Sequence, residues 1–169
     1  MLLLAGCGHG KDAAGSKPSP SATMEMGGRG QLGDLQISAA YVPEPASPSV
    51  AAAYVTVRNT GPDTDTLIRA STPAGKSTTL HRDVTSGGSE GMVALRSVPI
   101  PAGKSVAMKP GGIHLMIEHP RSGLIRGGQV ELTLVFAHAG RLTMQVPIVS
   151  PAGLNDGMPD MPGMPGMGG

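Results

Sequence analysis

The sequence predicts an all-β domain, an antiparallel Greek-key β-sandwich, flanked by flexible N- and C-terminal tails. Short runs of alternating polar and apolar residues recur through residues 31–150, and turn sequences rich in Gly and Pro separate them. No window in this part of the chain has the apolar spacing of a long amphipathic helix. The chain has 169 residues, of which 26 are Gly and 16 are Pro, and these are concentrated toward both ends. We therefore expect one folded domain between two linker-like segments.

Nine candidate strands follow one another along this domain, each combining two-residue alternation with β-branched residues. They are expected at residues 35–42, 50–59, 66–71, 78–84, 92–98, 105–109, 114–119, 129–137 and 141–149. Turn signals such as Asn59-Thr-Gly-Pro62 and Pro110-Gly-Gly112 lie between them. Because the chain has one Phe, two Tyr and no Trp, the core between the two sheets must consist of Val, Leu, Ile and Ala. Many short strands at this spacing are typical of a sandwich.

The segment before the domain contains a candidate lipidation signal. The tetrapeptide Leu4-Ala5-Gly6-Cys7 resembles the bacterial lipobox, in which a lipid is attached to the cysteine sulfur and the chain is cleaved before that residue. We interpret residues 1–6 as the remnant of a signal peptide and residues 7–30 as a flexible tether. The expected location is the outer face of the bacterial cell membrane. The alternative is a run of small residues with a free thiol at Cys7.

Charge and composition exclude several classes of function. The formal net charge is +1, no block of like charge is present, and aromatic residues make up 2% of the chain. A nucleic-acid-binding protein would need a basic surface or aromatic side chains that stack on bases, so this class is excluded. No Ser-His-Asp spacing, phosphate-binding loop or carboxylate pair stands out, and we expect a protein that is not an enzyme.

Two of the five histidines form a spaced pattern with methionines. Ten residues separate His81 from Met92, a further 21 separate Met92 from His114, and one residue separates His114 from Met116. The pattern is therefore H-x10-M-x21-H-x-M. A chance match at three fixed offsets is rare, because the chain has only five His and eleven Met residues. The pattern predicts a metal site formed by these four side chains.

The chemistry of the four side chains favours Cu(I). Thioether sulfur is a soft ligand and imidazole suits copper, whereas Mg²⁺ and Ca²⁺ prefer oxygen ligands, which the pattern lacks. His114 and Met116 are two residues apart on a predicted strand and so project from one face, while Leu115 and Ile117 point into the core. We expect a shallow surface site on a rigid sheet, with His81 and Met92 contributed by neighbouring strand ends.

The pattern resembles the copper-binding signature of the PCuAC family of extracytoplasmic Cu(I) chaperones. The sequences TLHRDV around His81, GMVALRSV at Met92 and VPIPAGKSVAMKPGGIHLMIE through His114 and Met116 also match. The resemblance covers about residues 33–150. It implies a monomeric, cupredoxin-like sandwich that carries copper for assembly of the copper centre of cytochrome c oxidase. It also implies two partners, a Sco-type thioredoxin-fold copper protein and cytochrome c oxidase subunit II.

Three other functions compete with delivery of copper. A copper-scavenging or resistance protein would use the same four ligands to sequester Cu(I) at the cell surface, and the sequence does not separate it from a chaperone. A blue-copper electron carrier would need a cysteine thiolate in the sandwich, and Cys7 lies far upstream. An adhesion or scaffold sandwich would bind no metal at all.

The C-terminal tail, residues 151–169, is rich in Met, Pro and Gly and is a candidate auxiliary Cu(I) binder. Its methionines recur every third residue, at Met158, Met161, Met164 and Met167. In a polyproline II helix they would lie on one face about 9 Å apart, too far for two sulfur atoms to share one ion without folding back. We expect weaker copper binding here than in the sandwich, or a simple spacer. Further candidates in the tether are His9, Met24 and Met26.

The remaining methionines and histidines of the domain are not expected to bind metal. Met108 and Met144 fall outside the pattern and suit core packing, for which the flexible methionine side chain is well adapted. His119 follows His114 by five residues, which places it on the opposite face of the strand. His138 lies in the turn Ala137-His-Ala-Gly140 and is expected to be solvated.

Overall fold

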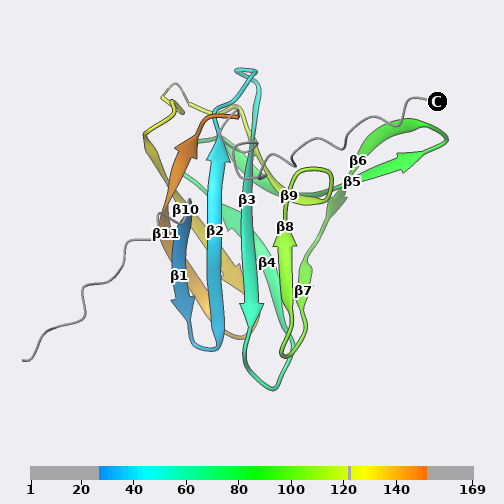
Figure 1. Cartoon of the computed structure of the whole chain (residues 1–169), viewed down its shortest axis with the longest axis vertical. Helices are drawn as coiled ribbons and strands as arrows, with labels where there is room; N and C mark the ends of the chain where they lie inside the picture. The colour runs from blue at the N-terminus through cyan, green and yellow to red at the C-terminus, as the bar shows by residue number, and fades with distance from the viewer. Residues whose placement is uncertain (1–26, 122, 152–169) are drawn as a thin grey trace, which may run out of the picture.

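The computed structural model describes residues 27–121 and 123–151, and every regular element in these ranges is a β-strand (Figure 1). The strands are β1 Gly28–Leu32, β2 Leu35–Pro43, β3 Val50–Asn59, β4 Asp65–Ser71, β5 Ser77–Ser86, β6 Ser89–Leu95, β7 Val98–Ile100, β8 Ser105–Met108, β9 Ile113–Glu118, β10 Gln129–Phe136 and β11 Gly140–Val149. Within the described ranges, no helix has the length and apolar character needed to span a membrane.

The strands form two layers, and one continuous series of hydrogen-bonded strands runs through both layers. The strand order is β6-β5-β9-β3-β2-β11-β10-β4-β7, with β1 added beside β2 and β8 beside β3. In Figure 1, β1, β2, β3 and β8 lie in front, and β10, β11 and β4 lie behind them. Two residue pairs between β11 and β2 join the layers, and this contact is parallel whereas the other strand pairs are antiparallel. The predicted all-β sandwich is confirmed, with this one parallel pair as an exception.

Strand β3 is long enough to pair with two different neighbours along one edge. Its first half pairs with β9, through Ala51–Ile117 and Ala53–Leu115, and its second half pairs with β8. Its side chains alternate strictly, so that every second residue from Ala51 is buried. Burial of these apolar side chains from β3 and its neighbours removes them from water and stabilises the sandwich. The same alternation places Ala52 and Tyr54 on the opposite face of the sheet.

Two strands differ from those predicted from the sequence. Strand β1 begins at Gly28, inside the segment expected to be a tether. The expected strand 92–98 is instead two strands, because the chain leaves β5 after Leu95 and joins β4 in the other layer at Val98. The other eight predicted strands are present, with ends that shift by at most two residues.

The hairpin formed by β5 and β6 projects from the body of the sandwich (Figure 1). Strand β5 pairs with β9 only as far as Arg82, and beyond this residue it pairs with β6 alone. Strand β6 is the edge of the sheet, and six of its seven residues are exposed. Residues on β6 are therefore open to an approaching molecule.

Candidate metal centre

The four motif residues lie on one face of the three strands β6, β5 and β9. His81 on β5 is directly opposite His114 on β9, and Met92 on β6 is opposite Asp83, two residues along β5 from His81. Met116 is opposite Thr79, two residues from His81 in the other direction. Residues paired across antiparallel strands share a face, as do residues two apart along a strand. The register therefore gathers the two imidazoles at the centre, with one methionine on each side.

The two imidazole rings are held close together. Their centroids are 6.0 Å apart and their planes differ by 21°. The two rings are therefore neighbours on the same face of the sheet. Within the described ranges, no three His, Cys, Asp or Glu side chains gather as a metal-binding group. The donor set at this position is two imidazoles and two thioethers, which suits Cu(I).

Each imidazole has one nitrogen in contact with a polar neighbour. The hydroxyl of Thr79 lies 3.0 Å from Nε2 of His81, while Nδ1 of His81 is buried and has no hydrogen-bond partner. Nδ1 of His114 lies 3.3 Å from the carbonyl oxygen of Gly112 and 3.6 Å from a carboxylate oxygen of Asp83. A buried polar atom without a partner is rare in a folded protein and calls for an explanation.

The four side chains differ in exposure, and the expected shallow surface site includes one buried ligand candidate. His114 is 6% exposed, His81 and Met116 are half-buried, and Met92 is 58% exposed. His81 and Met92 also lie within β5 and β6 rather than at strand ends. The site therefore runs from a buried imidazole to a methionine on the edge strand. Core packing does not account for Met92, because so much of its side chain is in solvent.

A groove of about 490 Å³ opens beside Met92. Its lining includes Asp83, Glu90, Met92 and Gly111. The chain's two tyrosines also contact each other, with ring centroids of Tyr41 and Tyr54 5.2 Å apart and ring planes tilted by 43°. Burial raises the pKa of Tyr54, and the nearby Tyr41 and Asp83 raise it further, so this phenol stays neutral.

The two methionines outside the pattern lie where the sequence predicts, whereas His119, expected on the opposite face of the strand, lies just beyond its end. Met108 and Met144 are buried in the core, and Leu115 and Ile117 are fully buried. His119 is exposed just after β9 ends, with φ at 45°. Several candidates lie outside the described residues: Cys7, His9, Met24, Met26, Met158, Met161, Met164 and Met167.

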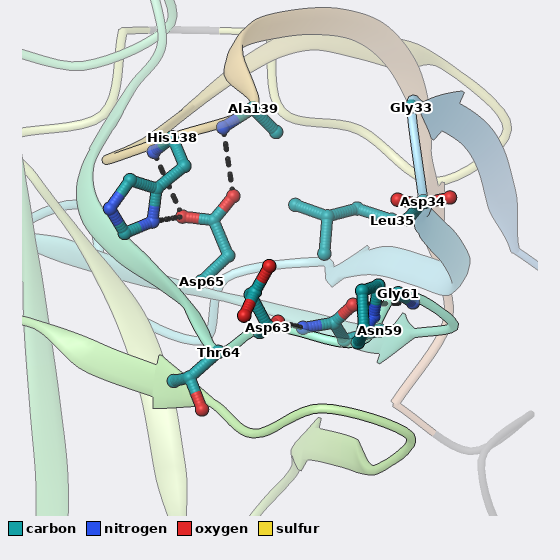
Figure 2. Close-up of a pocket in the computed structure, with 11 residues that line it drawn as sticks. Gly33, Asp34, Leu35, Asn59, Gly61, Asp63, Thr64, Asp65, His138 and Ala139 are labelled. Atoms are coloured by element: carbon teal, nitrogen blue, oxygen red, sulfur yellow. Dashed lines mark hydrogen bonds and ion pairs between the residues drawn. The ribbon is translucent and has the colours of Figure 1, made fainter.

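A larger pocket of about 700 Å³ lies at the other end of β3, around Asn59 and Asp65 (Figure 2). The carboxylate of Asp65 accepts hydrogen bonds from the backbone N–H groups of Thr66, His138 and Ala139 at 2.6, 3.0 and 2.8 Å. Burial raises the pKa of Asp65, but these three donors and the His138 ring outweigh it, so its pKa lies below the ordinary value.

Residues that line this second pocket make internal contacts that the sequence did not predict. Nδ2 of Asn59 donates to the carbonyl oxygens of Asp63 and Ile100, and Oδ1 of Asn59 accepts from the N–H of Gly61. His138, expected to be a solvated turn residue, has a side chain that is 76% exposed. Asn59 and Asp65 thus tie loops to strand ends, and we assign them a structural role.

Solved structures of two other proteins share this fold. The copper-bound PCuAC domain from PmoF2 matches with a TM-score of 0.63 and 23% identity, over 73% of this chain and 98% of that domain. The solution structure of CuI-DR1885 from Deinococcus radiodurans matches with a TM-score of 0.56 and 28% identity, over 66% of this chain and 76% of that chain. The resemblance to PCuAC domains that the sequence predicts is confirmed for the fold.

The sequence itself places the chain in a family. The family model described as "Putative lipoprotein LpqE-like" matches residues 35–148, most of the described sandwich. A relative from Leifsonia xyli subsp. xyli (strain CTCB07), named "Putative lipoprotein Lxx21020", is 31% identical over 157 residues, which is 92% of this chain and 88% of that protein. The chain belongs to the LpqE-like family. The roles of His81, Met92, His114 and Met116 as metal ligands stay a prediction.

Proposed function

We propose that this protein is an extracytoplasmic Cu(I) carrier that binds one ion between His81, Met92, His114 and Met116. The observation that carries the proposal is the direct pairing of His81 with His114 across β5 and β9, with a methionine on either side of the pair on the same face. Two imidazoles and two thioethers favour Cu(I) over hard cations. Copper-bound structures of PCuAC domains with this fold support the proposal.

The gradient of exposure suits transfer of the ion to a partner. A thiolate or imidazole of the partner binds Cu(I) from the side of the edge strand β6, and the bond to the sulfur of Met92 then breaks. The oxidation state of copper does not change, and the methionine sulfur leaves as a neutral thioether. His114 is the most buried ligand and releases the ion last. The groove beside Met92 gives the incoming side chain room.

For its cellular role, we propose delivery of copper toward the copper centre of cytochrome c oxidase, with a Sco-type protein and subunit II of the oxidase as partners. The resemblance to PCuAC chaperones supports this role. We further propose that a lipid on Cys7 anchors the protein to the outer face of the cell membrane, which the lipobox-like sequence and the lipoprotein relatives support. Outside the cytoplasm thiols tend to oxidise, and methionine ligands avoid disulfide formation.

A Cu(I) competition titration against a chromophoric chelator tests the binding function. Met116→Leu keeps volume and apolarity, so the free energy of unfolding should change by less than about 1.5 kcal/mol. Cu(I) affinity should fall at least about tenfold, or about 1.4 kcal/mol. Met144→Leu is the matched control, because Met144 is a core residue outside the site. Equal affinity of Met116→Leu and the parent would show that Met116 is not a ligand.

An experiment in cells distinguishes a protein that delivers copper from one that sequesters it. A deletion strain that loses oxidase activity at low copper, while keeping normal copper tolerance, is expected for a chaperone. Normal oxidase activity with reduced copper tolerance would instead identify a scavenging protein. Complementation with the Met92→Leu variant, which should retain the fold because Met92 is exposed, ties either phenotype to the site.

A further inference from the structure

We infer that Thr79 is a positioning residue that fixes the tautomer of His81, so that His81 binds the ion through Nδ1 while His114 binds it through Nε2. The inference rests on the proposed Cu(I) function and concerns how the same site is built. Thr79 is outside the four-residue pattern, but it lies on β5 two residues before His81 and on the same face. Its hydroxyl is 3.0 Å from Nε2 of His81.

The buried Nδ1 of His81 decides between the two possible tautomers. Nδ1 is inaccessible to solvent and has no hydrogen-bond partner. If the single N–H hydrogen of the neutral His81 ring were on Nδ1, a buried N–H donor would have no acceptor, which is costly. If the hydrogen is on Nε2, it donates to the hydroxyl oxygen of Thr79, and Nδ1 presents a bare lone pair. Only the second tautomer leaves a nitrogen of His81 ready to bind a cation without a rearrangement of its other contact.

Binding through Nε2 of His81 would be the less favourable arrangement. The ion would have to displace the hydroxyl of Thr79, and the hydrogen would move to the buried Nδ1, where no acceptor is available. Binding through Nδ1 instead satisfies the orphaned atom and keeps the hydrogen bond to Thr79. Metal-bound histidines in general donate their second N–H to a neighbouring oxygen, which fixes the ring orientation.

His114 has the opposite arrangement. Its Nδ1 faces two oxygen acceptors, the carbonyl of Gly112 at 3.3 Å and the carboxylate of Asp83 at 3.6 Å. Two acceptors on one side place the hydrogen on Nδ1 and leave Nε2 free for the ion. The carbonyl of Gly112 is the closer acceptor, and it belongs to the turn that leads into β9. In this assignment one ring binds the ion through Nδ1 and the other through Nε2, and the two ring planes differ by 21°.

The test is an NMR measurement of the ring nitrogens in the full chain labelled with ¹⁵N-histidine. Without copper and at a pH where both rings are neutral, we expect the Nε2–H tautomer at His81 and the Nδ1–H tautomer at His114. One equivalent of Cu(I), which is diamagnetic, should shift Nδ1 of His81 and Nε2 of His114. Thr79→Val removes the hydroxyl at similar volume and should abolish the tautomer preference of His81. It should also lower Cu(I) affinity about tenfold, the lower end of the usual effect of such supporting residues.

Thr79→Ser is the matched control, because it keeps the hydroxyl and should keep both the tautomer and the affinity. A larger shift at Nε2 of His81 than at Nδ1 on copper addition would overturn the inference while leaving the Cu(I) function intact. An unchanged His81 tautomer in Thr79→Val would do the same. If neither ring shifts in the parent protein, the proposed Cu(I) site itself is wrong. The tautomer measurement on the copper-free protein needs no metal and so tests the role of Thr79 separately.

Discussion

Replacement of Met92 by Leu should separate metal binding from folding more cleanly than a change at any other proposed ligand. The side chain is 58% exposed on the edge strand β6, where its partner across the hairpin is Asp83. An exposed substitution that keeps apolarity should change the free energy of unfolding by no more than about 0.5 kcal/mol. Loss of one soft ligand should nevertheless weaken Cu(I) binding at least about tenfold, which corresponds to about 1.4 kcal/mol.

The assay compares Cu(I) affinity and transfer rate at one equivalent of copper, with thermal unfolding measured on the same samples. Val93→Leu is the control, because Val93 is the next residue on β6, is similarly exposed at 50%, and points to the other face of the hairpin. Its affinity and transfer rate should equal those of the parent. If Met92→Leu binds and transfers Cu(I) as the parent does, then the edge of the sheet does not contribute a ligand and the transfer route proposed through Met92 is wrong.

Three further changes have distinct expected results. Asp65→Ala leaves three backbone N–H donors without an acceptor and should lower the free energy of unfolding by about 1–3 kcal/mol at pH 7, with unchanged Cu(I) affinity. Because the pKa of Asp65 is lowered in the fold, its contribution is present above the ordinary aspartate pKa and is lost as pH falls through the lowered value, so acid unfolding of parent and Asp65→Ala should converge at low pH. Cys7→Ser should move the protein from the membrane to the soluble fraction in a bacterial host; identical partitioning would exclude a lipid anchor. Truncation after Ser150 should preserve thermal stability and reduce total Cu(I) capacity or transfer rate, whereas unchanged values of both would make the tail a spacer.

The sequence predicted the class of fold because apolar and polar residues alternate in almost every strand. It missed β1 because the sequence GRGQL resembles a linker. The structure gives a reason for those glycines: a Cβ at Gly28 would lie 2.7 Å from the carbonyl oxygen of Gln145, and a Cβ at Gly30 would lie 2.8 Å from Leu142. Close approach of the β11 backbone favours a residue without a side chain at Gly28, and this requirement depends on a strand more than 100 residues away.

The split of the expected strand 92–98 was equally invisible in the sequence. The alternation continues from β6 into β7, but the chain changes layers near Arg96, and a two-residue period carries no information about which neighbour a strand pairs with.

The site was predicted as a set of residue types and spacings rather than as a geometry. The spacing of His114 and Met116 correctly placed both on one face, and the burial of Leu115 and Ile117 on the other face is confirmed. The burial of His114 depends on the pairing of β5 with β9, which the sequence does not encode locally. The contact of Thr79 with His81 joins two residues of the same strand, and the pattern of His and Met residues gave no signal for Thr79.

The most direct test of the account is X-ray absorption at the copper edge on the full chain loaded with one equivalent of Cu(I). The account predicts a first shell that contains both imidazole nitrogen and thioether sulfur, two of each, from His81, His114, Met92 and Met116. A shell of sulfur alone would place the ion on the methionine-rich tail, and a shell of nitrogen and oxygen alone would exclude the methionines as ligands. Either result would contradict a mixed site on β5, β6 and β9.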